Sequence, residues 1–267
     1  MFNPNPPANN DVVTLTRTGS GSVIVNLTDP SNPVFASLTI DDQSNHGITL
    51  ASANSFGTTG GMTVGDAGTG QFNQTGGTTS FRHLTVGSQA NSAGTVKLSG
   101  GALNDDAIIG DVGVGIFNYT NATHNKAGNL ILGNQSTGNG TYTITGNSAQ
   151  TKVTFVSGGS SGNPNGALLV GNAGTGSFTQ GTNATDAGNQ VNFAGDTMLG
   201  QQIGSANTYL LNSGILTVGS QLAVGGQSLG ANSFTQNGGT LNLANTAFGT
   251  PDFVSVGPGF APFGGAL

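Results

Sequence analysis

The chain has 267 residues, of which 47 are glycine and only 6% are charged, and its formal net charge at pH 7 is -6. Its 5 lysine and arginine residues are scattered along the sequence, whereas nucleic acids and anionic membrane surfaces are bound by grouped basic side chains. No run approaches the roughly 18 apolar residues of a membrane helix, so neither a nucleic-acid partner nor membrane insertion is expected.

The chain begins with MFNPNPPANN (residues 1–10), which is expected to form an extended arm. This arm lacks the basic and apolar regions of a signal peptide, so no uncleaved signal peptide is expected. Three strand-like runs follow, and the Asp-Pro and Asn-Pro pairs between them favour turns. These runs are Val12–Leu15, Ser22–Leu27 and Ala36–Ile40.

The stretch Met62–Arg82 (MTVGDAGTGQFNQTGGTTSFR) defines a unit that recurs along the chain. It contains an apolar residue followed by an anchor glycine, then an aromatic residue, then a Gly-Gly corner. The anchor glycines, expected at corners where the backbone takes a positive φ, are Gly65, Gly87, Gly110, Gly133, Gly171, Gly200 and Gly225. The apolar residues before them, expected in the core, are Val64, Val86, Ile109, Leu132, Val170, Leu199 and Val224. The intervals 65 to 87, 87 to 110 and 110 to 133 are 22, 23 and 23 residues, which predicts coils of about 22–25 residues.

A second core position returns at a fixed distance after each anchor glycine. The distance is seven residues for Phe72, Phe117 and Phe178, and nine for Val96, Tyr142, Tyr209 and Phe234. It therefore changes by two and never by one. Because side chains alternate between the two faces of a strand, a change of two keeps these residues on the same face. The pattern predicts strands stacked in register around a common core.

A third apolar run follows each glycine corner, for example Leu216 and Val218 after Gly214. No apolar stripe with the 3.6-residue period of a helix is present. Parallel sheets otherwise need helical crossovers, so the sequence predicts an all-β, single-domain parallel β-helix (β-solenoid) with three strands per coil over residues 11–250. Residues 251–267, rich in Gly, Pro and Phe, are expected to form a C-terminal segment or cap.

The motifs LTVGSQANSAGTVKLSGG and LLVGNAGTGSFTQ resemble the passenger-associated strand repeats of bacterial autotransporters, and equally the repeats of anchored bacterial exoproteins. The resemblance covers roughly residues 36–257. It implies a right-handed parallel β-helix displayed outside the cell. The sequence carries neither an autotransporter barrel nor a sorting tail, so the resemblance implies no particular mode of attachment.

Two groups of aspartates have the composition of paired catalytic carboxylates or of calcium ligands. They are Asp41-Asp42, and Asp105-Asp106 with Asp111. Unlike the aspartate of calcium-binding repeats, they do not recur in every coil. Turn residues on a solvated edge are therefore the favoured interpretation.

The histidines His46, His83 and His124 fall at unrelated positions of the repeat, with no carboxylate at metal-site spacing. They are expected on the surface or in caps. No catalytic residue, metal site or cofactor is therefore expected from the sequence.

The two ends of the predicted solenoid are candidate assembly sites, because each exposes an unpaired strand edge. Neither end of the sequence offers a capping helix or a group of charges. We hypothesise that the end of one subunit stacks on the start of the next, in a contact that does not close on itself. The candidate assembly residues are Phe2, Pro4 and Pro6 at the start and Phe253, Phe260 and Phe263 at the end. The alternative is that both segments are frayed termini or irregular caps of a monomer.

Together these features favour a non-enzymatic, extracellular structural protein of a bacterial surface that assembles head to tail with copies of itself into a fibre or matrix. The alternative function is a monomeric adhesin or passenger stalk that binds a glycan or a host surface, and a polysaccharide-active enzyme on the same scaffold comes third. An exposed aromatic cluster with nearby aspartates would favour glycan binding, whereas end coils that match each other would favour the fibre.

Overall fold

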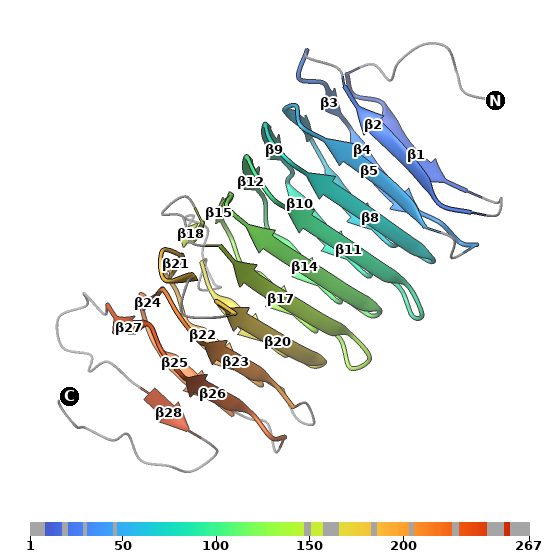
Figure 1. Cartoon of the computed structure of the whole chain (residues 1–267). Helices are drawn as coiled ribbons and strands as arrows, with labels where there is room; N and C mark the ends of the chain where they lie inside the picture. Colours follow the sequence, from blue (N-terminus) through green and yellow to red (C-terminus); the bar gives the residue numbers. More distant parts are fainter. Residues whose placement is uncertain are drawn as a thin grey trace.

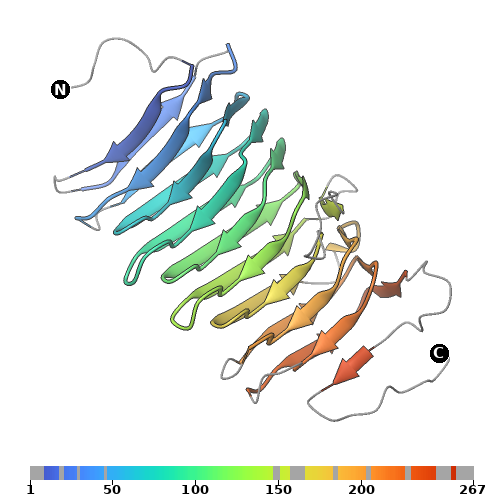
Figure 2. The ribbon, with the colours of Figure 1, turned by 180° about the vertical axis from the view of Figure 1, so that it is seen from behind.

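The computed structural model describes residues 9–17, 21–28, 31–44, 47–146, 151–156, 166–182, 186–202, 206–225, 230–244 and 254–256. Within these residues the chain is all-β and contains no α-helix. Its strands form three parallel sheets that run side by side along a rod, each coil contributing one strand to each sheet (Figure 1, Figure 2). The predicted fold class, a parallel β-solenoid with three strands per coil, is confirmed.

The sheets are named here A, B and C in the order in which the chain enters them, and their strands are given over the described residues. Sheet A has 10 strands, in the order β1 (Val12–Thr16), β4 (Ser37–Asp41), β7 (Gly61–Val64), β10 (His83–Val86), β13 (Ala107–Ile109), β16 (Leu130–Leu132), β19 (Leu168–Val170), β22 (Thr197–Leu199), β25 (Leu222–Val224) and β28 (Val254–Val256). Sheet B has 9 strands, in the order β2 (Val23–Leu27), β5 (Ile48–Ser52), β8 (Thr69–Gln74), β11 (Ala93–Leu98), β14 (Val114–Thr120), β17 (Asn139–Thr145), β20 (Thr175–Gln180), β23 (Thr208–Leu211) and β26 (Ser233–Gln236). Sheet C has 9 strands, in the order β3 (Val34–Phe35), β6 (Phe56–Thr58), β9 (Thr78–Ser80), β12 (Ala102–Asn104), β15 (Thr123–Ala127), β18 (Lys152–Val156), β21 (Gln190–Phe193), β24 (Ile215–Val218) and β27 (Thr240–Leu243).

The core is a set of side-chain columns that run up the inside of the rod. The buried members of the expected core are Val64, Phe72, Val86, Val96, Ile109, Phe117, Leu132, Tyr142, Val170, Phe178, Leu199, Tyr209 and Val224, and Phe234 is partly buried. Each fully buried side chain of this kind stabilises the fold by about 1.5–3 kcal/mol. Burial is complete in the central coils and partial at the two ends, so the core of each coil is covered by its neighbours.

The aromatic residues of sheet B form one of these columns. The strand register places Phe117 beside Tyr142, Tyr142 beside Phe178 and Phe178 beside Tyr209. Their ring centroids are 4.7, 5.0 and 4.6 Å apart and the rings are nearly parallel. Such pairs add about 0.5–1.5 kcal/mol each beyond the buried area. The in-register stacking predicted from the two-residue steps is therefore confirmed by the observed pairing.

The corner between sheets A and B shows why the number of residues from the anchor glycine to the second core position changes by two. It spans Gly65–Gly68 after β7 and Gly87–Ser92 after β10, which is two residues longer, yet Phe72 and Val96 are still paired. The longer corner only extends the loop that projects from the rod. The φ angles of the anchor glycines are positive, between 64 and 78 degrees, at Gly65, Gly87, Gly110, Gly133, Gly171, Gly200 and Gly225. A Cβ atom on Gly65 would lie 2.5 Å from the carbonyl oxygen of Ala93 in the next coil, so only glycine fits.

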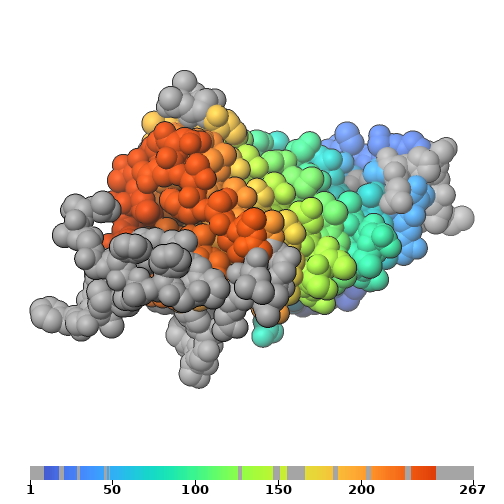
Figure 3. All heavy atoms as spheres, turned by 90° about the horizontal axis from the view of Figure 1, so that it is seen from below, coloured from blue at the N-terminus to red at the C-terminus, as the bar shows by residue number. Residues whose placement is uncertain are grey.

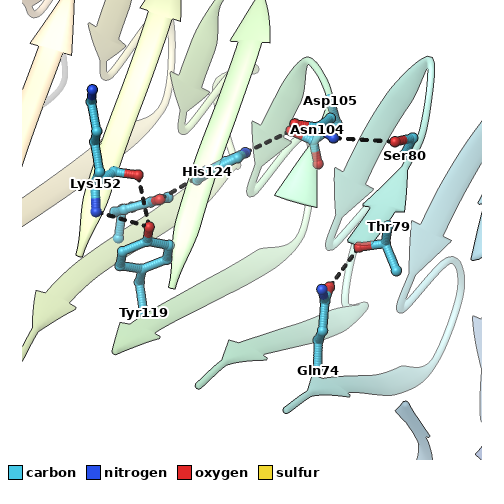
Figure 4. Close-up of polar contacts among 9 residues, drawn as sticks. Gln74, Thr79, Ser80, Asn104, Asp105, Tyr119, His124 and Lys152 are labelled. Carbon is cyan, nitrogen blue, oxygen red and sulfur yellow. Dashed lines mark hydrogen bonds and ion pairs between the residues drawn. The ribbon is translucent and has the colours of Figure 1, made fainter. Parts of the chain in front are cut away.

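The glutamine two residues after the aromatic residue closes the corner between sheets B and C. Gln74 is buried, and its Nε2 donates to the carbonyl oxygen of Ala102 at 2.9 Å. Gln180 makes the equivalent bond in a later coil. In the same column, the hydroxyl of Tyr119 lies 2.7 Å from the carbonyl oxygen of Lys152 (Figure 4). These side chains satisfy corner carbonyl groups that would otherwise be buried without a partner.

We predict that Phe178→Ala lowers the free energy of unfolding by about 3–5 kcal/mol, because it removes a ring stacked on both neighbouring coils and leaves a cavity. Thr179→Ala is the matched control, since Thr179 is the next residue of β20 and faces outward, and its effect should stay within about 0.5 kcal/mol. Urea unfolding followed by circular dichroism measures both. Equal effects of the two substitutions would contradict the assigned alternation of faces.

Candidate functional site: the two ends of the solenoid

The N-terminal end presents an open edge in all three sheets. In the described chain β1, β2 and β3 each pair with one strand only (Figure 1). Val12 is 73% exposed and Ile24 is 66% exposed. The inward-facing residues Val13, Leu15, Val25 and Leu27 are only partly buried. This end therefore combines unpaired backbone groups with incompletely covered apolar side chains.

The C-terminal end has the same character over its described residues. β26 and β27 end sheets B and C, whereas β28 adds one further strand to sheet A beyond β25. Figure 3 shows the coils as successive bands of colour between the blue N-terminal end and the red C-terminal end. The inward-facing Phe234, Leu241 and Leu243 are only partly buried, and the described residues from 206 onward carry no charged side chain. Both ends thus present partly buried apolar side chains along the rod, and the N-terminal end also carries the charged residues Asp11 and Arg17, which flank β1.

The candidate assembly residues lie outside the described residues. They are Phe2, Pro4, Pro6, Phe253, Phe260 and Phe263. β28 falls within the segment 251–267, in which the sequence predicts a C-terminal segment or cap, and it pairs with β25. The solenoid therefore continues in sheet A beyond residue 250.

Asp41 and Asp42 are buried, so the expectation of a solvated edge is wrong for this pair. The Oδ1 atom of Asp41 accepts hydrogen bonds from the backbone N–H groups of Asp66, Ala67 and Gly68 at 2.9, 3.0 and 2.8 Å. This carboxylate organises the corner of the next coil. Its Oδ1 atom is thus part of the backbone hydrogen bonding of that corner.

The second group of aspartates is not brought together. Asp105 is fully buried, whereas Asp111 lies at a partly exposed corner. The Oδ1 atom of Asp111 accepts from Asn134 Nδ2 at 2.8 Å, and Asn134 Oδ1 in turn accepts from Asn172 Nδ2 at 2.8 Å. Asp111 therefore begins a polar ladder up the outside of the rod, as expected for outward-facing residues of stacked coils.

His124 is fully buried, contrary to the expected surface or cap position. The register of sheet C pairs it with Leu103 on one side and Val153 on the other. The sequence contained a signal for this placement, since Leu103 and His124 each follow a core residue, Leu98 and Tyr119, by five positions. Of the other histidines, His83 is partly exposed on sheet A and His46 lies outside the described residues.

The imidazole of His124 joins two buried polar groups. Its Nε2 lies 2.7 Å from Asp105 Oδ1, a contact visible in Figure 4, and its Nδ1 lies 2.8 Å from the hydroxyl of Tyr142. The ring also stacks on Phe117, with centroids 5.2 Å apart and planes 4 degrees apart. Burial raises the pKa of Tyr142 well above its usual value, so its hydroxyl remains protonated.

A histidine between a carboxylate and a hydroxyl is also the arrangement that activates a nucleophile. Here Asp105, His124 and Tyr142 are each 0% exposed, so a substrate has no access to the hydroxyl. The cluster instead satisfies polar atoms that the core would otherwise leave unpaired. Its chemistry is that of a structural network.

No group of three or more potential metal ligands occurs among the described residues. The described chain also contains no helix long and apolar enough to cross a membrane. Comparison with protein-family models, with curated proteins and with solved structures gave no match to this chain. The functional argument therefore depends on the geometry of the rod and its ends.

We predict that His124→Leu lowers the free energy of unfolding by about 3–5 kcal/mol, because the buried carboxylate of Asp105 loses its imidazole partner. Adding Asp105→Leu should restore most of that loss, since leucine and valine already occupy the neighbouring positions of the His124 column. Urea unfolding of the two single variants and the double variant closes the thermodynamic cycle. A double variant no more stable than His124→Leu would contradict the network.

We also predict a loss of stability in alkaline solution. The chain contains 3 tyrosines, and burial raises the pKa of Tyr119, Tyr142 and Tyr209 above their usual value of 10.0. Because the pKa is higher in the folded state, the stabilisation is complete below about pH 10 and declines above it. The decline amounts to about 1.4 kcal/mol per pH unit for each tyrosine.

Phenolate absorbance recorded together with circular dichroism measures this effect. The absorbance should appear only as the β signal disappears, and Tyr209→Phe should make the decline shallower. Phenolate formation near pH 10 with the β signal intact would show that the hydroxyl groups are accessible in the folded state.

Proposed function

We propose that this protein is a non-enzymatic structural protein whose protomers stack end to end into a fibre, with further copies of itself as its partner. The observation that carries the proposal is that, over the described residues, both ends of the rod are uncapped and expose incompletely covered apolar columns. The solenoid provides no internal reason for growth to stop at either end, and an end-to-end contact is heterologous and does not close.

The side chains at the two ends belong to the same columns. In sheet B, Val25 at the start and Phe234 at the end lie in one continuous inward column. In sheet A, the register runs from Leu15 at the start through Val224 to Val256 in the last strand, β28. A second copy placed on the end in the same register would continue apolar columns with apolar side chains.

The backbone of β2 offers a second argument. The N–H group of Val23 donates to the carbonyl oxygen of Gly47 at 3.1 Å, on the side of β2 that pairs with β5. Successive backbone groups of a strand point to opposite sides, so the N–H and C=O groups of Ile24 and Asn26 point to the open edge. Strand addition at such an edge is a general mode of association.

An extracellular location at a bacterial surface forms part of the proposal, and it rests on the resemblance of the repeats to autotransporter passengers and anchored exoproteins. The adhesin alternative calls for an exposed aromatic cluster. Among the described side chains the aromatic residues are buried, apart from the partly buried Phe234. No observation on the described chain therefore favours glycan binding over assembly.

We predict unbranched filaments in negative-stain electron microscopy of the purified protein, with light scattering that rises steeply with concentration. Ile24→Pro should abolish them, because proline removes an N–H donor at the open edge and leaves the hydrogen bonds between β2 and β5 in place. Ile24→Ala is the matched control, since it removes the side chain and keeps the N–H group. It should still form filaments.

Removing residues 257–267 tests the opposite end while retaining every described strand, and it should shorten or abolish the filaments. Circular dichroism of each variant confirms that the solenoid is folded. Single rods of wild-type protein at all concentrations, or filaments unaffected by Ile24→Pro, would be inconsistent with end-to-end stacking.

A further inference from the structure

The outward face of sheet A changes character along the rod. The register aligns one outward residue from each coil, in the order Thr39, Thr63, Thr85, Ile108, Ile131, Leu169, Met198 and Ala223. The first three are threonines, and the next four carry large apolar side chains. We call Ile108, Ile131, Leu169 and Met198 the apolar stripe. All four are partly exposed.

Sheet C carries polar residues in the equivalent column, and in sheet B outward apolar residues such as Ile116 and Leu210 stand singly between threonines. In sheet C the aligned outward residues are Ser80, Asn104, Asn125, Thr154, Asn192, Thr217 and Asn242. Asn104 Nδ2 donates to Ser80 Oγ at 3.2 Å, which begins a hydrogen-bonded ladder (Figure 4). A run of four adjacent apolar residues therefore distinguishes the apolar stripe from the outward column of sheet C.

The strands beneath the stripe read as continuous apolar runs, namely AII in β13, LIL in β16 and LLV in β19. Such runs are typical of parallel strands that are covered on both faces. The inner face of these strands is covered by the core, with Ile109, Leu132 and Val170 each 0% exposed. Their composition thus indicates that the outer face is also covered in the working protein.

We propose that the apolar stripe is a lateral contact with the stripe of a second copy of this chain. Two copies share the same spacing between coils, about 4.8 Å, so the side chains of one stripe fit between those of the other along its whole length. An unrelated surface has no reason to match this repeat. The inference rests on the proposed fibre, which it extends from single filaments to bundles.

The charges beside the stripe favour parallel rods. Asp106 and Asp196 lie at the corners that precede β13 and β22, on the same side of the stripe, and both are partly exposed. An antiparallel pair would bring Asp106 of one copy over Asp196 of the other, and like charges placed opposite each other oppose association. In a parallel pair the facing strands run in opposite directions, so the aspartates of the two copies lie on opposite sides of the joined stripes, and each stripe side chain lies within half a coil spacing of its own counterpart.

The size of the stripe predicts when the contact forms. Four coils of about 4.8 Å and strands of three residues at about 3.3 Å give a footprint of about 150–200 Å² per copy. Specific stable interfaces need about 800 Å² per partner, so isolated protomers should pair only weakly and at high concentration. A filament repeats the stripe along one side, and multivalency converts the weak contact into a stable one.

The test compares filaments of wild-type protein with those of the double variant Ile131→Asn/Leu169→Asn in electron microscopy. Wild-type filaments should form bundles, and the double variant should form single filaments of unchanged length. The matched control, Thr63→Asn/Thr85→Asn, alters the same outward column outside the stripe and should still form bundles. Single wild-type filaments, or bundles that survive in the double variant, would overturn the lateral contact and leave end-to-end stacking intact.

Cross-linking provides a second readout, because the chain contains no cysteine. Ile108→Cys should be joined to itself by a bis-maleimide that spans about 10 Å, the distance between packed sheets. Asn118→Cys, on the outward face of sheet B, should remain monomeric on a denaturing gel. If Ile108→Cys is not cross-linked but pairs with Met198→Cys in a mixture, the rods are antiparallel and the parallel assignment fails.

If wild-type protein forms no filaments at all, the proposed function fails, and the lateral contact is then decided by cross-linking concentrated protomers. Covalent dimers of Ile108→Cys that are absent for Asn118→Cys would retain the contact. Their absence would overturn it as well.

Discussion

The hydrogen bonding of each coil to the next, in register and at one strand spacing, is the constraint on which the rest of this structure depends. Each interior strand donates to and accepts from both neighbouring coils, through alternate residues. The same register that satisfies the backbone also aligns the side chains, so residues of similar character recur over several coils of a column. Stacked tyrosine and phenylalanine rings, glutamines at the corners and asparagines outside all follow from that alignment. The glycine corners follow too, because a Cβ atom at Gly65 would collide with the coil above.

This construction explains how a chain with so few charges places polar groups inside. Gln74, Tyr119 and Gln180 lie in one column at the corner between sheets B and C, and each satisfies a carbonyl group of that corner. His124 interrupts a column of aliphatic residues, and its imidazole accommodates Asp105 and Tyr142 at once. Buried polar networks of this kind add little net stability but disfavour competing arrangements. In a repeat array, where a coil can slip by one repeat, a feature present in only one coil helps to fix the alignment.

The same constraint gives the rod two kinds of surface with different consequences. At the ends, the ladder stops with unpaired backbone groups and partly covered apolar columns, and both are satisfied by another coil. On the sides, the ladder is complete, and association depends on the side chains that project outward. Most outward columns are polar, whereas the stripe on sheet A is apolar over four coils. End-to-end growth and lateral packing are therefore separable properties of one fold, carried by different residues.

The sequence by itself determined the architecture. The spacing of the anchor glycines, the two-residue steps to Phe72 or Val96 and the lack of a helical period were enough to predict a three-stranded parallel solenoid, because both period and parity are local properties of the chain. It also placed residues such as Val64 and Phe178 correctly in the core. Only the tertiary structure decided the environment of Asp41, Asp42 and His124. Their burial depends on which residue of the adjacent coil lies beside them, and corners and insertions of variable length separate those residues in the sequence. The apolar stripe was also decided only by the tertiary structure, because its members become neighbours only once the coils are aligned. These members are Ile108, Ile131, Leu169 and Met198.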